Sequence, residues 1–71
     1  MTHFTRVVTI DGDRVTLCLP VPPTETPGTR DFDFWAEAAV LAEVRRLCGR
    51  RHGTGRLATV RDGVFRWLPG A

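Results

Sequence analysis

The stretch DFDFWAEAAVLAEVRRLCG, residues 31–49, decides the fold, because it is the one run long and periodic enough to form a full helix. Alanine, leucine, glutamate and arginine dominate it, and no proline or glycine interrupts it before Gly49. Asp31 or Asp33 is suited to cap the N-terminus, where backbone N–H groups lack partners. Gly49 is the predicted C-terminal stop, since glycine adopts the left-handed conformation freely.

One side of this predicted helix is apolar. At about 100° per residue, a single arc holds Phe34, Val40, Leu41, Val44, Leu47 and Cys48. Trp35, Ala39 and Ala42 lie on the opposite side. Glu37 falls within the apolar arc, and we expect its side chain to reach past the core edge to water or to an arginine. The alternative is a buried, functional carboxylate.

Two β-hairpins are predicted, one on either side of the helix. Residues 5–10 and 14–19 flank Asp11-Gly12, and residues 56–61 and 64–68 flank Asp62-Gly63. An Asp-Gly pair between alternating apolar runs is typical of a two-residue type I′ turn.

The turn fixes which residues pair, and the pairing decides which side chains share a face. In the first hairpin we expect Val8 opposite Val15, which places the apolar side chains on one face and Thr5, Thr9, Arg14 and Thr16 on the other. In the second we expect Val60 opposite Phe65 and Ala58 opposite Trp67, with Arg61 and Arg66 on the reverse.

Two further segments are predicted as connections. Residues 20–30, PVPPTETPGTR, contain four of the five prolines and form a stiff, extended connector. A polyproline II docking peptide is the alternative for this segment. Residues 49–55, GRRHGTG, are predicted to be a flexible basic loop.

The element order ββαββ therefore predicts a single small α+β domain over residues 1–71. Its expected architecture is a two-layer sandwich, in which a four-stranded antiparallel sheet carries one helix on one face. A chain of this length buries a marginal core. The expected oligomeric state is a monomer or a weak homodimer.

Composition argues against several classes of protein. No apolar run is long enough for a transmembrane helix, and the N-terminus shows no signal-peptide pattern, so we expect a cytoplasmic protein without membrane contact. Cys48 and His52 have the spacing of a minimal catalytic or metal-binding pair, with His3 and Cys18 elsewhere. No third group orients the histidine, and the cysteines fall on opposite sides of the sheet. We therefore predict neither an enzyme nor a metal or cofactor site.

Charge is distributed unevenly along the chain. Residues 1–43 carry three arginines and seven acids, whereas residues 44–71 carry seven arginines and one acid, and there is no lysine. Such asymmetry indicates an anionic partner. The candidate binding residues are Arg14, Arg45, Arg46, Arg50, Arg51, Arg56, Arg61 and Arg66, which we expect to form one basic surface across the sheet and the predicted loop.

These features favour a non-enzymatic binding protein, an inhibitor or adaptor that docks through an arginine-rich face on a larger protein or nucleoprotein and blocks a site there. Small phage-encoded inhibitors, such as anti-CRISPR proteins, have a similar size and a single domain, which is a likeness of class and not of motif. The alternative is a DNA- or RNA-binding regulator that uses the same face.

Overall fold

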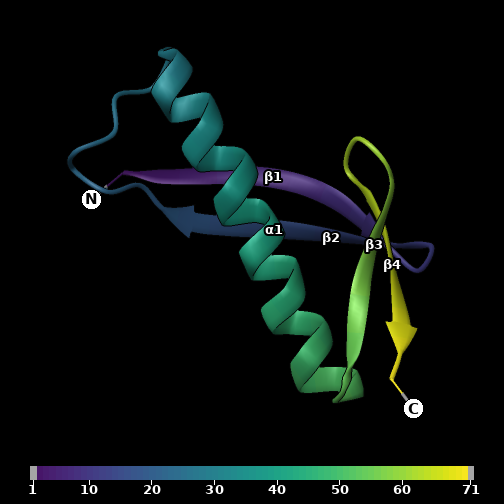
Figure 1. Ribbon diagram of the computed structural model, residues 1–71. Coiled ribbons are helices and arrows are strands. Elements are labelled where there is room, and N and C mark those ends of the chain that lie inside the picture. Colours follow the sequence, from purple (N-terminus) through teal and green to yellow (C-terminus); the bar gives the residue numbers. More distant parts are fainter. Residues whose placement is uncertain (1, 71) are drawn as a thin grey trace.

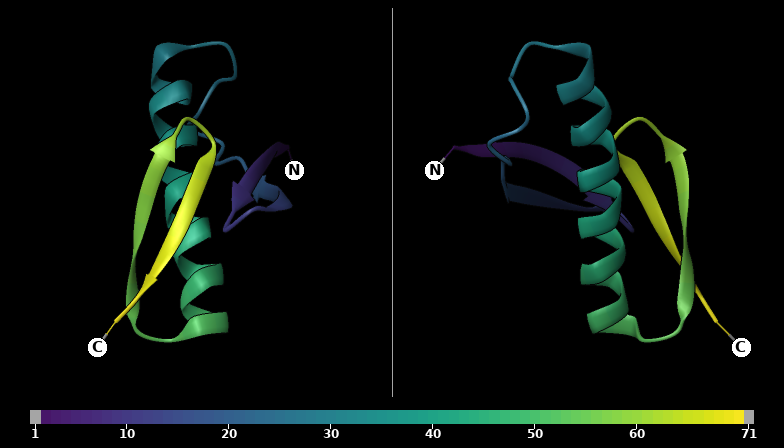
Figure 2. Two further views of the ribbon diagram at one scale, coloured as in Figure 1. Left: turned by 90° about the vertical axis from the view of Figure 1, so that its right-hand side faces the viewer. Right: turned by 60° about the vertical axis from the view of Figure 1, so that its left-hand side comes forward.

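The computed structural model describes residues 2–70 and contains five elements in the order ββαββ (Figure 1). They are β1 (His3–Ile10), β2 (Asp13–Pro20), α1 (Arg30–His52), β3 (Gly55–Arg61) and β4 (Val64–Pro69). The predicted element order and α+β class are confirmed. The helix packs across one face of a four-stranded sheet and leaves the other face uncovered (Figures 1 and 2).

The first hairpin has the register that its turn predicts. Val8 pairs with Val15 and Ile10 with Asp13. Asp11 and Gly12 both have positive φ, at 51° and 85°, as a type I′ turn requires. This register directs the apolar side chains of both strands toward α1, with the exception of Val7 and Cys18.

The second hairpin does not follow the predicted register. Thr59, and not Val60, pairs with Phe65, and the pairing shifts by one residue between Thr59 and Arg61. Gly63 has a φ of 74°, but Asp62, unlike Asp11, does not have a positive φ. A type I′ turn needs positive φ at both positions, so this turn is not type I′. The same Asp-Gly dipeptide has therefore produced a different turn and a bulge.

The bulge changes which side chains face the core. Leu57 pairs with Trp67, where the sequence predicted Ala58. Val60 is left 56% exposed. A bulge adds one unpaired residue to its strand, and here that residue allows the larger Leu57 to turn inward beside Trp67.

The strand order is β2-β1-β4-β3, and the sheet is mixed, so the prediction of a purely antiparallel sheet is wrong. β1 and β4 run parallel and pair only through Thr9 with Val64 and Ile10 with Phe65. The two hairpins consequently lie in different directions and meet near one end (Figure 2). Each hairpin is antiparallel for local reasons, whereas their relative direction depends on where α1 delivers the chain.

Hydrogen bonds at this junction extend beyond the paired residues. The N–H of Thr9 donates to the carbonyl of Gly63 at 2.8 Å, and that of Asp11 donates to the carbonyl of Phe65 at 3.0 Å. The N–H of Trp67 then donates to Oδ1 of Asp11 at 3.0 Å. The Asp11 side chain thus continues the ladder after the β1 backbone has turned away.

The helix begins and ends outside its predicted bounds. Thr29 is the N-cap, with its hydroxyl accepting from the N–H of Phe32 at 3.1 Å, where the sequence predicted Asp31 or Asp33. At the other end α1 continues through Gly49 to His52, and Gly53 terminates it with a φ of 74°. The predicted loop over residues 49–55 is therefore wrong.

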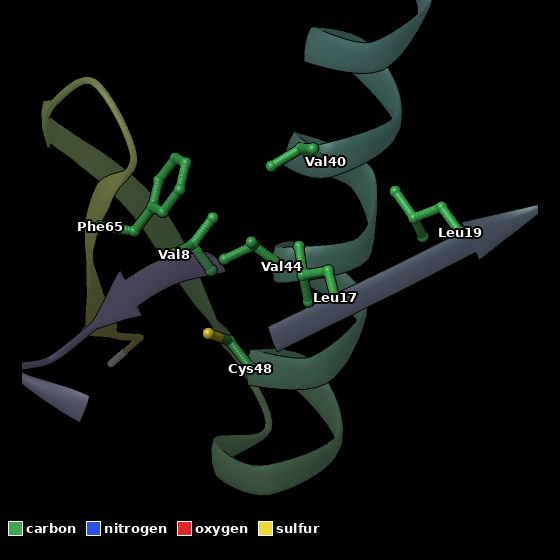
Figure 3. Close-up of a cluster of buried hydrophobic side chains, with 7 residues drawn as sticks. All are labelled: Val8, Leu17, Leu19, Val40, Val44, Cys48 and Phe65. Carbon is green, nitrogen blue, oxygen red and sulfur yellow. The ribbon is translucent and has the colours of Figure 1, made fainter. Parts of the chain in front are cut away.

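The core lies between α1 and the inward faces of the strands (Figure 3). Its buried side chains are Val8, Leu17, Leu19, Val40, Val44, Cys48 and Phe65. A second cluster, at the N-terminal end of α1, contains Val21, Phe32 and Ala36, with Phe4 and Trp35 packed against it. The Pro-rich connector contributes Val21, whose N–H donates to the carbonyl of Thr2 at 2.9 Å.

The buried side of α1 differs from the predicted arc at its N-terminal end. Phe34 was predicted to face the core and is 70% exposed, whereas Trp35 packs against both clusters. The buried stripe is the i, i+4 series Phe32, Ala36, Val40, Val44 and Cys48. It starts at Phe32, two residues before the first residue of the predicted apolar arc, because Phe32 packs on Phe4 and on Val21 of the connector.

Candidate interaction surface

The uncovered face of the sheet is formed by alternate residues of every strand. We name it the outer sheet face, and its strand positions are His3, Thr5, Val7, Thr9, Arg14, Thr16, Cys18, Pro20, Arg56, Ala58, Arg61, Val64, Arg66 and Leu68. Four of these residues are exposed arginines, and none is an acid. The alternation of strand side chains therefore concentrates positive charge on the face that α1 leaves open.

The arginines of the outer sheet face take no part in the ion pairs of residues 2–70. Those ion pairs join Arg6 to Glu37 and Arg46 to Glu43. Neither pair involves the four sheet arginines, which are Arg14, Arg56, Arg61 and Arg66. The four guanidinium groups are consequently available for bidentate hydrogen bonds to carboxylates or phosphates of another molecule.

The remaining predicted arginines lie in the other layer. Arg45, Arg46, Arg50 and Arg51 all belong to the C-terminal half of α1. The hydrogen bond from Arg46 to Glu43, reinforced by the negative charge of that carboxylate, raises the pKa of Arg46. The structure thus separates the eight candidate arginines into a sheet group and a helix group, because the segment predicted as a loop continues as helix.

Glu37 is held at the edge of the core by an arginine, as the sequence predicted. Its Oε1 accepts a hydrogen bond from Nη1 of Arg6 at 2.8 Å, and the carboxylate side chain remains 64% exposed. The Arg6 guanidinium also lies over the ring of Phe4, 5.1 Å from its centroid. The alternative that the Glu37 carboxylate is buried is therefore wrong.

A groove that the sequence did not predict lies between α1, β1 and the β3–β4 turn. Its lining residues are Arg6, Phe34, Glu37, Ala38, Val40, Leu41, Thr59, Asp62, Gly63 and Phe65. No local sequence signal marks it, since it depends on how far β1 extends past the second hairpin. Phe34, which the sequence placed toward the core, lines this groove and is exposed.

The cysteine and histidine considered as a catalytic pair are not arranged as a nucleophile and its base. Cys48 is buried in the core, and burial, together with the negative charge of Asp11, raises the pKa of its thiol against the opposing effect of Arg51. A protonated, enclosed thiol is a poor nucleophile. His52 is exposed in the last turn of α1, and Cys18 is exposed on the outer sheet face.

The described part of the chain contains no cluster of three or more histidine, cysteine, aspartate or glutamate side chains that is arranged to hold a metal ion. Its helix is not long and apolar enough to cross a membrane. Comparison with protein-family models, curated proteins and solved structures gives no match. The function is therefore argued from the geometry alone.

Proposed function

We propose that this protein is a small binding protein, an inhibitor or adaptor, that docks through the outer sheet face on a negatively charged surface of a larger protein or nucleoprotein. The observation that carries the proposal is the set of four exposed arginines on an uncovered sheet face without an acid among its strand residues. None of the ion pairs within residues 2–70 involves these four arginines, so an anionic partner can supply their counter-charges.

The surface combines charge with apolar contact area. Val7, which is 52% exposed, lies on this face among threonines and arginines. Arginine contributes strongly at protein interfaces because its planar group both stacks and forms paired hydrogen bonds. Positive potential on one face also accelerates the encounter with an acidic surface.

A protein surface fits this face better than single-stranded nucleic acid. Recognition of unpaired bases usually relies on aromatic side chains as stacking platforms. The outer sheet face has no aromatic residue other than His3 among its strand positions, since Phe65 and Trp67 turn inward. Duplex DNA, bound through its phosphates alone, remains the second candidate, because it needs only the arginines.

Paired charge reversals test the proposal. Arg14→Glu with Arg66→Glu alters the outer sheet face, and Arg45→Glu with Arg50→Glu makes the same change of charge on α1. Each variant and the unaltered protein would be immobilised and exposed to lysate treated with nuclease, and the same proteins would be titrated with random-sequence duplex DNA at several salt concentrations.

We expect a protein that is retained by the unaltered chain and by the helix variant, and lost with the sheet variant. Retention by all three proteins, or loss with the helix variant alone, would overturn the assignment of the face. Loss of every partner on nuclease treatment, together with duplex binding that weakens steeply with salt, would replace the protein partner with nucleic acid.

A further inference from the structure

Half of one edge of β1 has no neighbouring strand among the described residues. The N–H groups of Thr9 and Asp11 point toward β4, and strand geometry directs those of His3, Thr5 and Val7 the same way. Because β4 begins opposite Thr9, these three residues extend past it with their backbone groups free for another strand. We name residues 3–7 on this side the open edge. At about 3.3 Å per residue it is roughly 17 Å long.

The groove described above reaches β1 at Arg6, within the residues of the open edge. α1, which crosses β1 (Figure 1), forms one wall with Phe34, Ala38 and Leu41, and the β3–β4 turn contributes Asp62 and Gly63 at one end. Phe34 is 70% exposed here. A strand added to the open edge would therefore place alternate side chains against apolar helix residues, in the position that β4 occupies farther along.

The charges around the groove are mostly negative. The acids Asp33, Glu37 and Asp62 surround Phe34 and the groove, against Arg6 and Arg30. Arg6 and Glu37 already pair with each other, so Asp33 and Asp62 against Arg30 leave one net negative charge for a ligand. A segment with arginine or lysine between apolar residues complements this surface, which is opposite in sign to the outer sheet face.

We infer that the open edge and its groove bind an extended, basic and apolar segment of a partner protein, which adds as a fifth strand beside β1. Backbone hydrogen bonds to His3, Thr5 and Val7 supply affinity, and the side chains facing Phe34 and Asp62 supply selectivity. A second copy of β1 does not fit, because its own α1 would meet the α1 that already covers this position.

Proline substitution provides a matched test. Thr5→Pro removes an N–H from the open edge, and Thr16→Pro removes one from the free edge of β2. Both threonines lie on the outer sheet face, and neither N–H takes part in the β1–β2 ladder. Proline is tolerated where the missing N–H faces solvent. Phe34→Ser, at an exposed helix position, tests the groove wall without a core change.

The probe is a random ten-residue peptide library, displayed on yeast and selected against the unaltered protein. Enriched peptides should alternate apolar and basic residues. Thr5→Pro and Phe34→Ser should each weaken them by about tenfold or more, through a lost hydrogen bond and a lost apolar contact. Thr16→Pro, and the sheet reversal Arg14→Glu with Arg66→Glu, should leave their affinity unchanged, which separates this site from the proposed function.

The inference would be overturned by selection of no peptide, by equal binding to the Thr5→Pro and Thr16→Pro variants, or by enrichment of acidic peptides. Loss of peptide binding in the variant Arg14→Glu with Arg66→Glu would mean that the peptide binds the outer sheet face, and this result would likewise reject the groove as its site. Circular dichroism of each variant shows whether it is folded. If Thr5→Pro does not fold, the affinity of Phe34→Ser for the selected peptides tests the inference.

Discussion

Replacing Asp11 with alanine should loosen the junction of the two hairpins. Only two residue pairs join β1 to β4, and the Asp11 carboxylate adds a hydrogen bond from the N–H of Trp67 at 3.0 Å. Asp11 also holds a φ of 51°, which aspartate and asparagine tolerate better than alanine. The substitution therefore removes one contact and strains one turn.

The expected cost is about 2 kcal/mol of unfolding free energy. The hydrogen bond contributes about 1 kcal/mol, at the low end for a charged acceptor because Asp11 is exposed. Left-handed backbone at alanine adds about 1 kcal/mol. For a domain of this size the total corresponds to a fall of roughly 10 °C in Tm.

Urea and thermal unfolding followed by circular dichroism measure this cost, and two variants separate its parts. Asp11→Asn keeps an oxygen acceptor and should lose about 0.5 kcal/mol or less. Asp62→Ala changes the matching aspartate of the second turn and should be nearly neutral, since Asp62 has neither a positive φ nor a side-chain hydrogen bond among those of the described residues. Equal destabilisation by Asp62→Ala and Asp11→Ala would refute the reasoning.

Two other perturbations have defined signs. The pKa of Cys48 is raised by burial, so its stabilising effect is complete below the unfolded thiol pKa of about 8.5 and is lost as pH rises toward the folded value. The unfolding free energy should therefore fall above that pH relative to Cys48→Ala, and parallel curves for the two proteins would contradict this. Gly49→Ala, inside α1, should stabilise the protein by about 1 kcal/mol. Gly53→Ala, at a φ of 74°, should destabilise it by about 2 kcal/mol. The urea unfolding midpoints of the two variants show whether the effects have opposite signs.

Local signals predicted much of the fold. The register of the first hairpin follows from Asp11-Gly12 and the alternation around it, and the element order follows from periodicity. Those signals failed where two outcomes share one sequence pattern. Asp62-Gly63 repeats the first turn pair but adopts another conformation, and Gly49 resembles a helix stop while Gly53 serves as one.

The helix passes Gly49 for a physical reason. Glycine inside a helix costs about 1 kcal/mol relative to alanine. One further turn places Arg50, Arg51 and His52 at the negative end of the helix dipole and lets Gly53 close the helix, its N–H donating to the carbonyl of Gly49 at 2.9 Å. Helix propensity alone could not predict that the gains from the helix dipole and from the Gly53 cap exceed the cost of Gly49.

The candidate surface was predictable to the extent that it lies on strands. The alternation of apolar and polar residues is enough to place Arg14 and Arg66 on the reverse of the apolar face, whereas Arg61 lies there because of the bulge in β3. Arg50 and Arg51 were predicted to lie on a loop because the helix was predicted to end at Gly49, and they lie on α1 instead. The parallel contact of β1 with β4, which creates the open edge, is a long-range pairing that no local pattern encodes.

Residue-resolved amide hydrogen exchange along β1 tests the arrangement most directly, because it reads both the junction and the open edge. Slow exchange is predicted at Arg6 and Val8, which pair with β2, and at Thr9, which donates to Gly63. Fast exchange is predicted at Thr5 and Val7. Rapid exchange at Thr9, or protection of Thr5 and Val7 equal to that of their neighbours, would contradict it.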